Sequence, residues 1–286
     1  MNIPSKEEIV KFNEKHIERQ LSACERRKIH IDLKNPKTIQ DKLNWLNIYD
    51  VNPLKWKCAD KILLRDYCKE VLGEDLCIPI LKVYKSVSEI NWDELPDSFA
   101  IKCNHGSGMN IIVKDKKNFD KKSAVEKLNK WVHEDFSIRN GFESHYHWIE
   151  PRIFVEKLMS DDKQKLSLYD YKFWCFNGEP KFYTINEGHG HGPIVHYNMD
   201  QKKSELERMD YKVPKSLDYK QPSNFKEMVE LSRKLSKPFK FVRVDFYEIN
   251  GKTYLGELTF VPGVGYFKYK RDEDDRRIGD LLSIKD

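Results

Sequence analysis

The chain has 286 residues, enough for one large domain or two modest ones with a sizeable core. Charged residues make up 34% of it, but their signs are mixed, the formal net charge is +5 and no dense basic stripe occurs, so we expect no nucleic-acid partner. The apolar runs are too short to span a membrane and the N-terminal residues lack the features of a signal peptide, which together favour a cytoplasmic protein.

Six cysteines are spread along the chain without the paired spacing of a metal site and without a dense disulfide framework. We therefore expect reduced and mostly buried thiols. No internal repeat or low-complexity segment is evident, and nothing in the sequence indicates an oligomeric state.

The first part of the chain is predicted to be helical. Residues 5–30 are polar and helix-prone, with a thin apolar stripe. Thr38 is a typical N-cap, with Asp41 three positions later, and begins a second helix that the following Asn-Pro pair would stop. A third helix is expected over residues 53–72, with Gly73 as its C-cap.

The middle of the chain mixes strands and helices. We expect strands at residues 79–84 and 152–159, the second of which carries Glu156. Helices are expected at residues 86–95 and 123–132.

A glycine-bearing loop joins two further predicted strands, residues 98–103 and 111–114. Backbone N–H groups of such a loop can approach an anion closely, and the loop residues concerned are Gly106, Ser107 and Gly108. The loop is not a Walker A loop, because it lacks Gly-Lys-Ser/Thr and is followed by a strand rather than a helix. An ordinary glycine turn is the alternative.

One lysine is a candidate phosphate contact, and a second is expected on a solvated surface. Lys102 ends the strand that feeds the glycine loop, where its point charge could meet a phosphate. Lys61 stands beside Asp60 within the third predicted helix, and an isolated pair of this kind is usually solvated. For Lys102, a side chain in solvent is the alternative.

A hairpin is predicted for residues 169–185, around an Asn-Gly turn. Because side chains alternate along a strand, Asp170, Lys172 and Trp174 share one face of its first strand. The sequence between this hairpin and a predicted helix at residues 225–235 is polar and irregular.

Two histidine pairs occur in poorly periodic stretches, one formed by His145 and His147 and the other by His189 and His191. Either pair could bind a metal. No cysteine or carboxylate at ligand spacing completes a site, so we expect a covering loop for the first pair and a flexible loop for the second.

A second hairpin is predicted near the C-terminus, where two runs rich in β-branched and aromatic residues flank an Asn-Gly pair over residues 241–260. Arg243 and Asp245 share a face of its first strand, and Glu257 and Thr259 share a face of its second. Each strand therefore buries one apolar face and keeps a short polar row.

The register of this hairpin decides whether the two polar rows meet. A two-residue loop would place Asp245 and Glu257 on opposite faces, whereas a three-residue loop that pairs Ile249 with Thr253 would place them side by side. Adjacent carboxylates repel, but a cation such as Mg²⁺ carrying phosphates offsets that repulsion. A solvated polar face without a metal is the alternative.

Several pieces of this sequence occur in a specific order, at 42–46 (KLNWL), 102–108 (KCNHGSG), 170–173 (DYKF) with 176–178 (FNG), and 242–245 (VRVD), followed by Glu-x-Thr-x-x-Pro-Gly. The ordered set resembles the ATP-grasp fold, and within it the TupA-like branch of bacterial surface-polysaccharide proteins, typified by a teichuronopeptide-synthesis protein. The resemblance extends from about residue 35 to the C-terminus, and its specificity comes from the order rather than from any one motif.

The resemblance implies an α+β ATP-grasp fold, in which two lobes clasp ATP. It implies a helical N-terminal region at residues 1–78, a small lobe with the glycine loop at residues 79–155, and a large lobe with the metal-binding hairpin at residues 156–286.

The resemblance also implies which residues hold the nucleotide, namely Lys61, Lys102, Gly106, Ser107, Gly108, Glu156 and Leu158. The lysines and the loop would contact the phosphates, and Glu156 and Leu158 would lie at the adenine and ribose edge. Lys172 would be a further phosphate contact with a catalytic role.

The metal ligands implied by the resemblance are Asp245, Glu257 and Thr259, which would bind Mg²⁺. Thr259 stands where the family usually has asparagine, and a hydroxyl is a weaker ligand than an amide oxygen. Arg243 would stabilise an oxyanion as charge develops during transfer.

By resemblance, the protein is expected to be an ATP- and Mg²⁺-dependent carboxylate–amine ligase. ATP phosphorylates a carboxylate, and an amine attacks the acylphosphate to give an amide. No protein nucleophile is required, which fits the lack of a Ser-His-Asp or Cys-His order. The family context suggests a uronic acid of a capsular or cell-surface polysaccharide as the carboxylate.

Three alternatives stay open at this point. A glycosyltransferase would need an Asp-x-Asp site, and the sequence offers that spacing at Asp272 and Asp274, within a charged tail. A sugar phosphotransferase would share the ATP site. A glycan-binding protein without activity agrees with the aromatic content, but not with the ordered lysines and acids.

Overall fold

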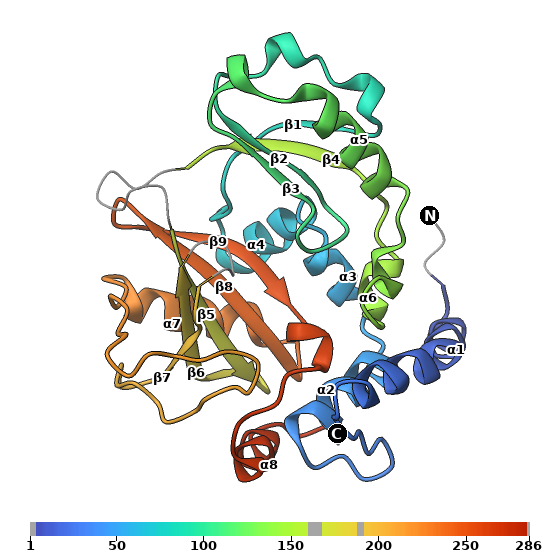
Figure 1. The fold of residues 1–286 in the computed structure, drawn as a ribbon, viewed down its shortest axis with the longest axis vertical. Coiled ribbons are helices and arrows are strands. Elements are labelled where there is room, and N and C mark those ends of the chain that lie inside the picture. Colours follow the sequence, from blue (N-terminus) through green and yellow to red (C-terminus); the bar gives the residue numbers. More distant parts are fainter. Residues whose placement is uncertain (1–3, 160–167, 188–191, 285–286) are drawn as a thin grey trace.

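Two antiparallel sheets form the framework of the protein, with helices packed around them (Figure 1). This computed structural model describes residues 4–159, 168–187 and 192–284. One sheet has four strands in the order β1-β4-β2-β3, and the other has five in the order β7-β6-β5-β8-β9. The combination of antiparallel sheets with separate helices confirms the predicted α+β class.

The four-stranded sheet consists of β1 (Ile80–Tyr84), β2 (Phe99–Cys103), β3 (Asn110–Val113) and β4 (Ile153–Lys157). Side chains alternate along β2, so that Phe99 and Ile101 are buried in one core with Leu128 of α5 (Lys121–Val132). Lys102 follows Ile101 and points to the opposite face, which fronts a cavity shared with the second sheet.

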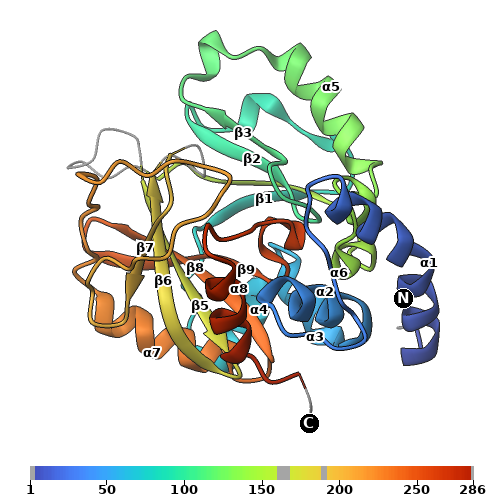
Figure 2. The same ribbon diagram turned by 60° about the horizontal axis from the view of Figure 1, so that its bottom comes forward.

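The five-stranded sheet consists of β5 (Tyr169–Phe176), β6 (Glu179–Glu187), β7 (Val195–Asn198), β8 (Phe241–Ile249) and β9 (Lys252–Thr259). The helix α7 (Phe225–Ser236) covers one face, where Met228 and Leu235 are fully buried against the sheet core. Near Trp174 the sheet packs against α2 (Ile39–Tyr49) and α8 (Asp272–Asp280) (Figure 2). The second helix of the chain and its last helix therefore meet on this sheet.

The N-terminal helices follow the predicted caps. Thr38 forms a capping box with Asp41 at the start of α2, and Gly73 adopts the left-handed conformation (φ 82°) after α4 (Leu64–Leu72). The first helix, α1, covers Lys6–Glu25. No helix among the described residues has the length and apolar character needed to cross a bilayer.

The prediction of one continuous helix over residues 53–72 is wrong. The chain forms α3 (Pro53–Ala59) and α4 instead, with a break at Asp60. The carboxylate of Asp60 is buried and accepts hydrogen bonds from the backbone N–H groups of Ile62 (2.8 Å) and Leu63 (3.2 Å) and from the side chain of Asn104 (2.9 Å). Asp60 thus offers the backbone an alternative to the helix ladder, and Lys61 follows in the turn.

Other segments also differ from the prediction. Residues 86–95 form two 3₁₀ turns, η1 (Val87–Glu89) and η2 (Trp92–Glu94), rather than one helix. The stretch expected to be irregular contains β7, and the charged tail contains α8, whose Ile278 is buried against α2. Further short turns are η3 (Lys116–Asn118), η4 (Phe136–Ile138), α6 (Ser144–His147) and η5 (Pro262–Gly265).

The predicted limits of the three regions stay a prediction. The limit between residues 155 and 156 falls inside β4, whose five residues pair with β1 and β2 as one strand. The N-terminal helices share cores with both sheets. Trp56 packs in the core that contains Phe99 of β2, and Leu43 packs in the core that contains Trp174 of β5.

Candidate active site

A cavity of about 410 Å³ lies between the two sheets and receives polar side chains from both. The side of the four-stranded sheet contributes Lys102 and Glu156, together with Lys61 from the turn after α3. The five-stranded sheet contributes five charged side chains to the opposite wall, which are Asp170, Lys172, Arg243, Asp245 and Glu257. Residues far apart in the sequence thus converge on one space.

The hairpin of β8 and β9 brings Asp245 directly opposite Glu257, and Arg243 opposite Thr259. The expectation that a three-residue loop would produce this register is wrong. Asn250 and Gly251 form a two-residue turn with positive φ at both positions (52° and 77°), and Ile249 pairs with Lys252.

A β-bulge at Gly256 restores the alignment that the two-residue turn alone would lose. Phe246 pairs with Leu255 and Asp245 pairs with Glu257, so Gly256 is the extra residue on β9. A Cβ atom at this position would lie 2.8 Å from the ring of Tyr247, which is too close for any side chain without rearrangement. The bulge therefore turns both acids into the cavity.

Asp245 is held by two cations. The guanidinium of Arg243 donates from Nε to Oδ1 (2.7 Å) and from Nη2 to Oδ2 (2.6 Å), and Lys172 donates to Oδ2 (2.9 Å). Lys172 lies on β5 directly opposite Asp245 of β8, which explains why its ammonium group can bond to this carboxylate. A buried carboxylate requires such partners, because an unpaired charge away from water is strongly unfavourable.

Glu257 is less enclosed by hydrogen bonds than Asp245. Its Oε1 accepts a hydrogen bond from the hydroxyl of Thr259 (3.1 Å), which itself accepts one from Arg243 (3.1 Å). Burial acts to raise the pKa of Glu257, but the charges of Lys61, Lys172 and Arg243 outweigh it and bring the pKa to about 2. Glu257 is therefore ionised at neutral pH.

The opposite wall is also preorganised. Lys61 donates from Nζ to the carbonyl oxygen of Gly106 (2.5 Å), so this lysine is anchored to the glycine loop. Lys102 forms an ion pair with Glu156 of the neighbouring strand. Gly108 has a positive φ of 71°, a conformation that glycine adopts without strain.

The structure brings together ten of the twelve predicted site residues as lining of the cavity, which are Lys61, Lys102, Gly106, Ser107, Gly108, Glu156, Lys172, Arg243, Asp245 and Glu257. Thr259 stands beside them through its bonds to Arg243 and Glu257. Leu158 follows β4 but is not among the lining residues. The position of these residues is thus known, while their roles stay a prediction.

Some lining residues were missed from the sequence, including Arg65, Asn186, His196, Arg208 and Tyr247. Arg65 follows Lys61 by four positions, a spacing that places two residues on one side of a helical turn and could have indicated it. Arg208 comes from a segment without periodicity, so no local pattern pointed to it.

Of the two histidine pairs, only His145 and His147 lie among the described residues, and they belong to no group there that could hold a metal ion. His145 and His147 lie on the short helix α6 rather than on a strand; His145 is buried, and His147 pairs with Asp135 (2.7 Å). His189 and His191 lie outside the described residues. The six cysteines are all buried free thiols, as predicted.

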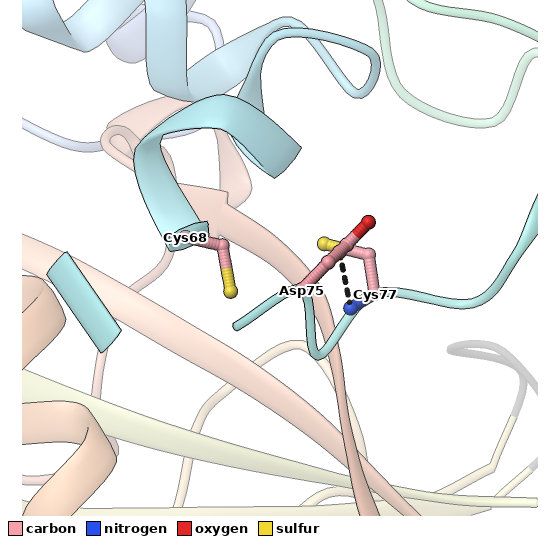
Figure 3. A group of neighbouring side chains, drawn as sticks. All are labelled: Cys68, Asp75 and Cys77. Atoms are coloured by element: carbon pink, nitrogen blue, oxygen red, sulfur yellow. Dashed lines mark hydrogen bonds between the residues drawn. The ribbon is translucent and has the colours of Figure 1, made fainter. Parts of the chain in front are cut away.

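Cys68, Asp75 and Cys77 form a compact group, with ligand atoms within 4.8 Å of one another (Figure 3). One carboxylate oxygen of Asp75 pairs with Arg65 (2.7 Å), and the other accepts a hydrogen bond from the backbone N–H of Cys77 (3.0 Å). A hydrogen bond with the Cys68 side chain, together with burial, raises the pKa of the Cys77 thiol well above its usual value. The arrangement orients Arg65 towards the cavity, which Cys77 also lines.

Two sheets that face each other across a cavity, with lysines on one wall and paired acids on the other, define an ATP-grasp fold. A sequence model of the TupA-like ATP-grasp family matches residues 41–283, so the chain belongs to this family. The match confirms the predicted family and fold. No curated protein matches the sequence.

Solved structures with a similar fold include the L-amino acid ligase from Bacillus licheniformis, with 14% identity and a TM-score of 0.45 over 73% of this chain and 44% of that chain. The D-alanine–D-alanine ligase from Helicobacter pylori has 14% identity and a TM-score of 0.45, over 85% of this chain and 69% of that one. The Bacillus anthracis enzyme has 16% identity and a TM-score of 0.43, over 92% and 85%. The chain thus spans less than half of the B. licheniformis ligase.

Proposed function

We propose that this protein is an ATP- and Mg²⁺-dependent carboxylate–amine ligase that forms an amide on a uronic acid, or a related carboxylate, of a bacterial surface polysaccharide. The observation that carries the proposal is the side-by-side pair of Asp245 and Glu257, which faces Lys61 and Lys102 across the cavity. The context of surface-polysaccharide synthesis is what the resemblance to the TupA-like branch implies.

The charges of the cavity suit a magnesium–nucleotide. Among the described lining residues, six are lysine or arginine and four are aspartate or glutamate, so the lining carries a net charge of +2. ATP brings several negative charges, and lysines and arginines offset them as the phosphoryl group is transferred. This excess of positive charge on otherwise paired side chains supports an anionic ligand.

The acids also fit a magnesium ion. The two oxygens of a carboxylate offer about four lone-pair positions, and Arg243 and Lys172 use three of those of Asp245. Among the described residues, hydrogen bonds reach Oε1 of Glu257 but not Oε2. Hard oxygen ligands of this kind suit Mg²⁺, which would neutralise charge on the phosphates when bound.

The side chains around the pair have roles that follow from their positions. Arg243 presents a fixed guanidinium beside both acids and would stabilise the oxyanion that develops on the carboxylate under attack. Lys172 would hold a transferred phosphoryl group, and Lys61 would fix the glycine loop over the phosphates through its bond to Gly106. These groups act by position and charge, without a covalent enzyme intermediate.

The two aspartates with the Asp-x-Asp spacing of a glycosyltransferase, Asp272 and Asp274, lie outside the lining of the active-site cavity. Asp274 is buried in ion pairs with Arg271 (2.8 Å) and Arg277 (2.9 Å) at the start of α8. Neither Asp272 nor Asp274 lines the cavity. The paired acids of the β8–β9 hairpin therefore support the ligase proposal better.

Incubation with ATP, Mg²⁺ and a panel of uronates and amines tests the function directly. ADP and phosphate released only when both a uronate and an amine are present support the ligase. ADP with a phosphorylated sugar would identify a sugar phosphotransferase, and UDP released from a UDP-sugar without ATP turnover would identify a glycosyltransferase. Glu230→Gln, which alters an exposed carboxylate on α7, is the control for Glu257→Gln.

A further inference from the structure

A second cavity, of about 400 Å³, lies between the C-terminal half of α1 and residues 139–141. It is separate from the active-site cavity, and the helices α1 and α6 lie on the same side of the molecule in both views (Figures 1 and 2). Four arginines line it, which are Arg19, Arg26, Arg27 and Arg139. No aspartate or glutamate is among its described lining residues.

Two of these arginines are held in place by neighbouring groups. Arg19 donates to the carbonyl oxygens of Ile138 (2.5 Å) and Gly141 (3.2 Å). Arg27 lies over the ring of Tyr266, 4.2 Å from its centroid, and donates to the carbonyl oxygen of Ala23 (3.1 Å). Each guanidinium has five N–H donors, so both arginines keep donors that these contacts leave unused.

The remaining two arginines are less constrained. Arg139 forms a long ion pair with Glu134 (3.4 Å). For Arg26, the described part of the chain provides no hydrogen bond or ion pair to the side chain. Structural contacts explain why Arg19 and Arg27 are present, but they do not explain why Arg26 and Arg139 add further positive charge to the same cavity.

We propose that this arginine cavity is a binding site for a ligand that carries two or more oxyanion charges, as phosphate esters or carboxylates of a sugar. A concave surface lined by charges of one sign concentrates the electrostatic potential and attracts ions of the other sign. The planar guanidinium matches phosphate and carboxylate oxygens in a two-pronged geometry that lysine does not reproduce. A volume of about 400 Å³ accommodates a small ligand.

The cavity is built partly outside the region that defines the family. Arg19, Arg26 and Arg27 precede residue 41, where the family match begins. Tyr266, which lies under Arg27, follows η5, and Gly263 of η5 lines the active-site cavity. The existence of this site does not depend on the proposed ligase reaction.

Calorimetric titration of the full chain with pyrophosphate and with a digalacturonate tests the proposal. Stronger binding of pyrophosphate would indicate a phosphate ester, and stronger binding of the digalacturonate an acidic sugar. The double variant R26A/R139A should weaken binding of the preferred probe about tenfold or more, because it removes two charged donors. R26K/R139K should bind the probe more tightly than R26A/R139A but less tightly than the wild type, since lysine keeps the positive charge but lacks the planar guanidinium.

The active-site cavity also attracts anions, so a separate measurement must show where the probe binds. K11A/K15A is the matched control, because it removes two exposed positive charges of α1 that do not line the arginine cavity. Hydrogen exchange should show ligand-dependent protection in residues 19–27 and 138–142. Equal affinity of R26A/R139A and K11A/K15A, or protection confined to the active-site segments, would overturn the proposal.

Discussion

Arg243 and Asp245 lie two residues apart on one face of β8 and form a two-pronged ion pair, with Nε–Oδ1 and Nη2–Oδ2 distances of 2.7 and 2.6 Å. The same guanidinium reaches Thr259 and Glu257 on the neighbouring strand. One arginine thus fixes the orientation of both acids. This arrangement depends on the planar fork of arginine and not on its charge alone.

Arg243→Lys should therefore abolish most of the ATP turnover while the protein stays folded. Lysine keeps the positive charge but cannot bond both oxygens of Asp245 and Thr259 together. We expect kcat to fall by about a hundredfold or more, the effect typical for loss of one oriented donor at a site of developing charge. Steady-state ADP release measures the change.

Arg233→Lys is the control for this substitution, because Arg233 is an exposed residue of α7 that pairs with Glu179 away from the cavity. Its turnover should match that of the wild type. If R243K retained wild-type kcat, the two-pronged contact would have no part in catalysis.

Acid should reduce the contribution of Glu257 to stability. Its pKa in the folded protein is about 2, below the ordinary value of 4.5, because three cations outweigh the effect of burial. A group whose folded pKa is lowered stabilises the protein fully above its unfolded pKa, and this stabilisation is lost as the pH falls towards the folded pKa.

Glu257→Gln removes this dependence and should destabilise the protein most near neutral pH. The difference in free energy of unfolding between wild type and E257Q should be constant above about pH 4.5 and shrink below it. Denaturant unfolding between about pH 7 and pH 3 measures it. A difference that grew on acidification would mean that the cations do not stabilise ionised Glu257.

The predicted meeting of Asp245 and Glu257 is correct, but the reason given for it is wrong. The alternation of side chains along a strand predicts that each acid lies on the polar side of its strand. The alignment of the two acids comes from a bulge, however, and not from the predicted three-residue loop. The strand contains Gly256, and a glycine inside a strand often marks a bulge, so the sequence did hold the needed signal.

The break at Asp60 could not be predicted in the same way. The helical pattern continues through residues 53–72, and the partner that holds the Asp60 carboxylate, Asn104, is 44 positions away in the sequence. The position of Lys61 in the cavity therefore follows from a long-range contact. Family resemblance identified this lysine, whereas local periodicity placed it on a solvated helix surface.

Gly256→Ala tests the bulge. A Cβ atom would lie 2.8 Å from the Tyr247 ring and 3.2 Å from the carbonyl oxygen of Asp245, so the strand or the ring must move. We expect a loss of stability of about 1–3 kcal/mol, as for other overpacked sites, and a larger fractional loss of ATP turnover because the register of the acids is disturbed. Thermal unfolding and ADP release measure the two effects.

Gly251→Asn is the matched control for that variant. Gly251 has a positive φ of 77° and nothing within 4 Å of an added Cβ atom, and asparagine tolerates this conformation in a two-residue turn. The variant G251N should have the stability and the ATP turnover of the wild type. Wild-type behaviour of G256A would show that the bulge tolerates a side chain and does not set the register.

Thr259→Asn should strengthen the response to magnesium. The Thr259 hydroxyl donates to Glu257 and accepts from Arg243, so it supports the acids through hydrogen bonds. An amide oxygen is a better ligand for a hard cation than a hydroxyl, and the resemblance implies asparagine at this position. We expect half-maximal ATP turnover at a Mg²⁺ concentration several-fold lower than for the wild type.

Thr259→Val removes the hydroxyl without adding a ligand, so it should raise the Mg²⁺ concentration needed for half-maximal turnover. If both variants shifted this concentration in the same direction, Thr259 would lie outside the metal site.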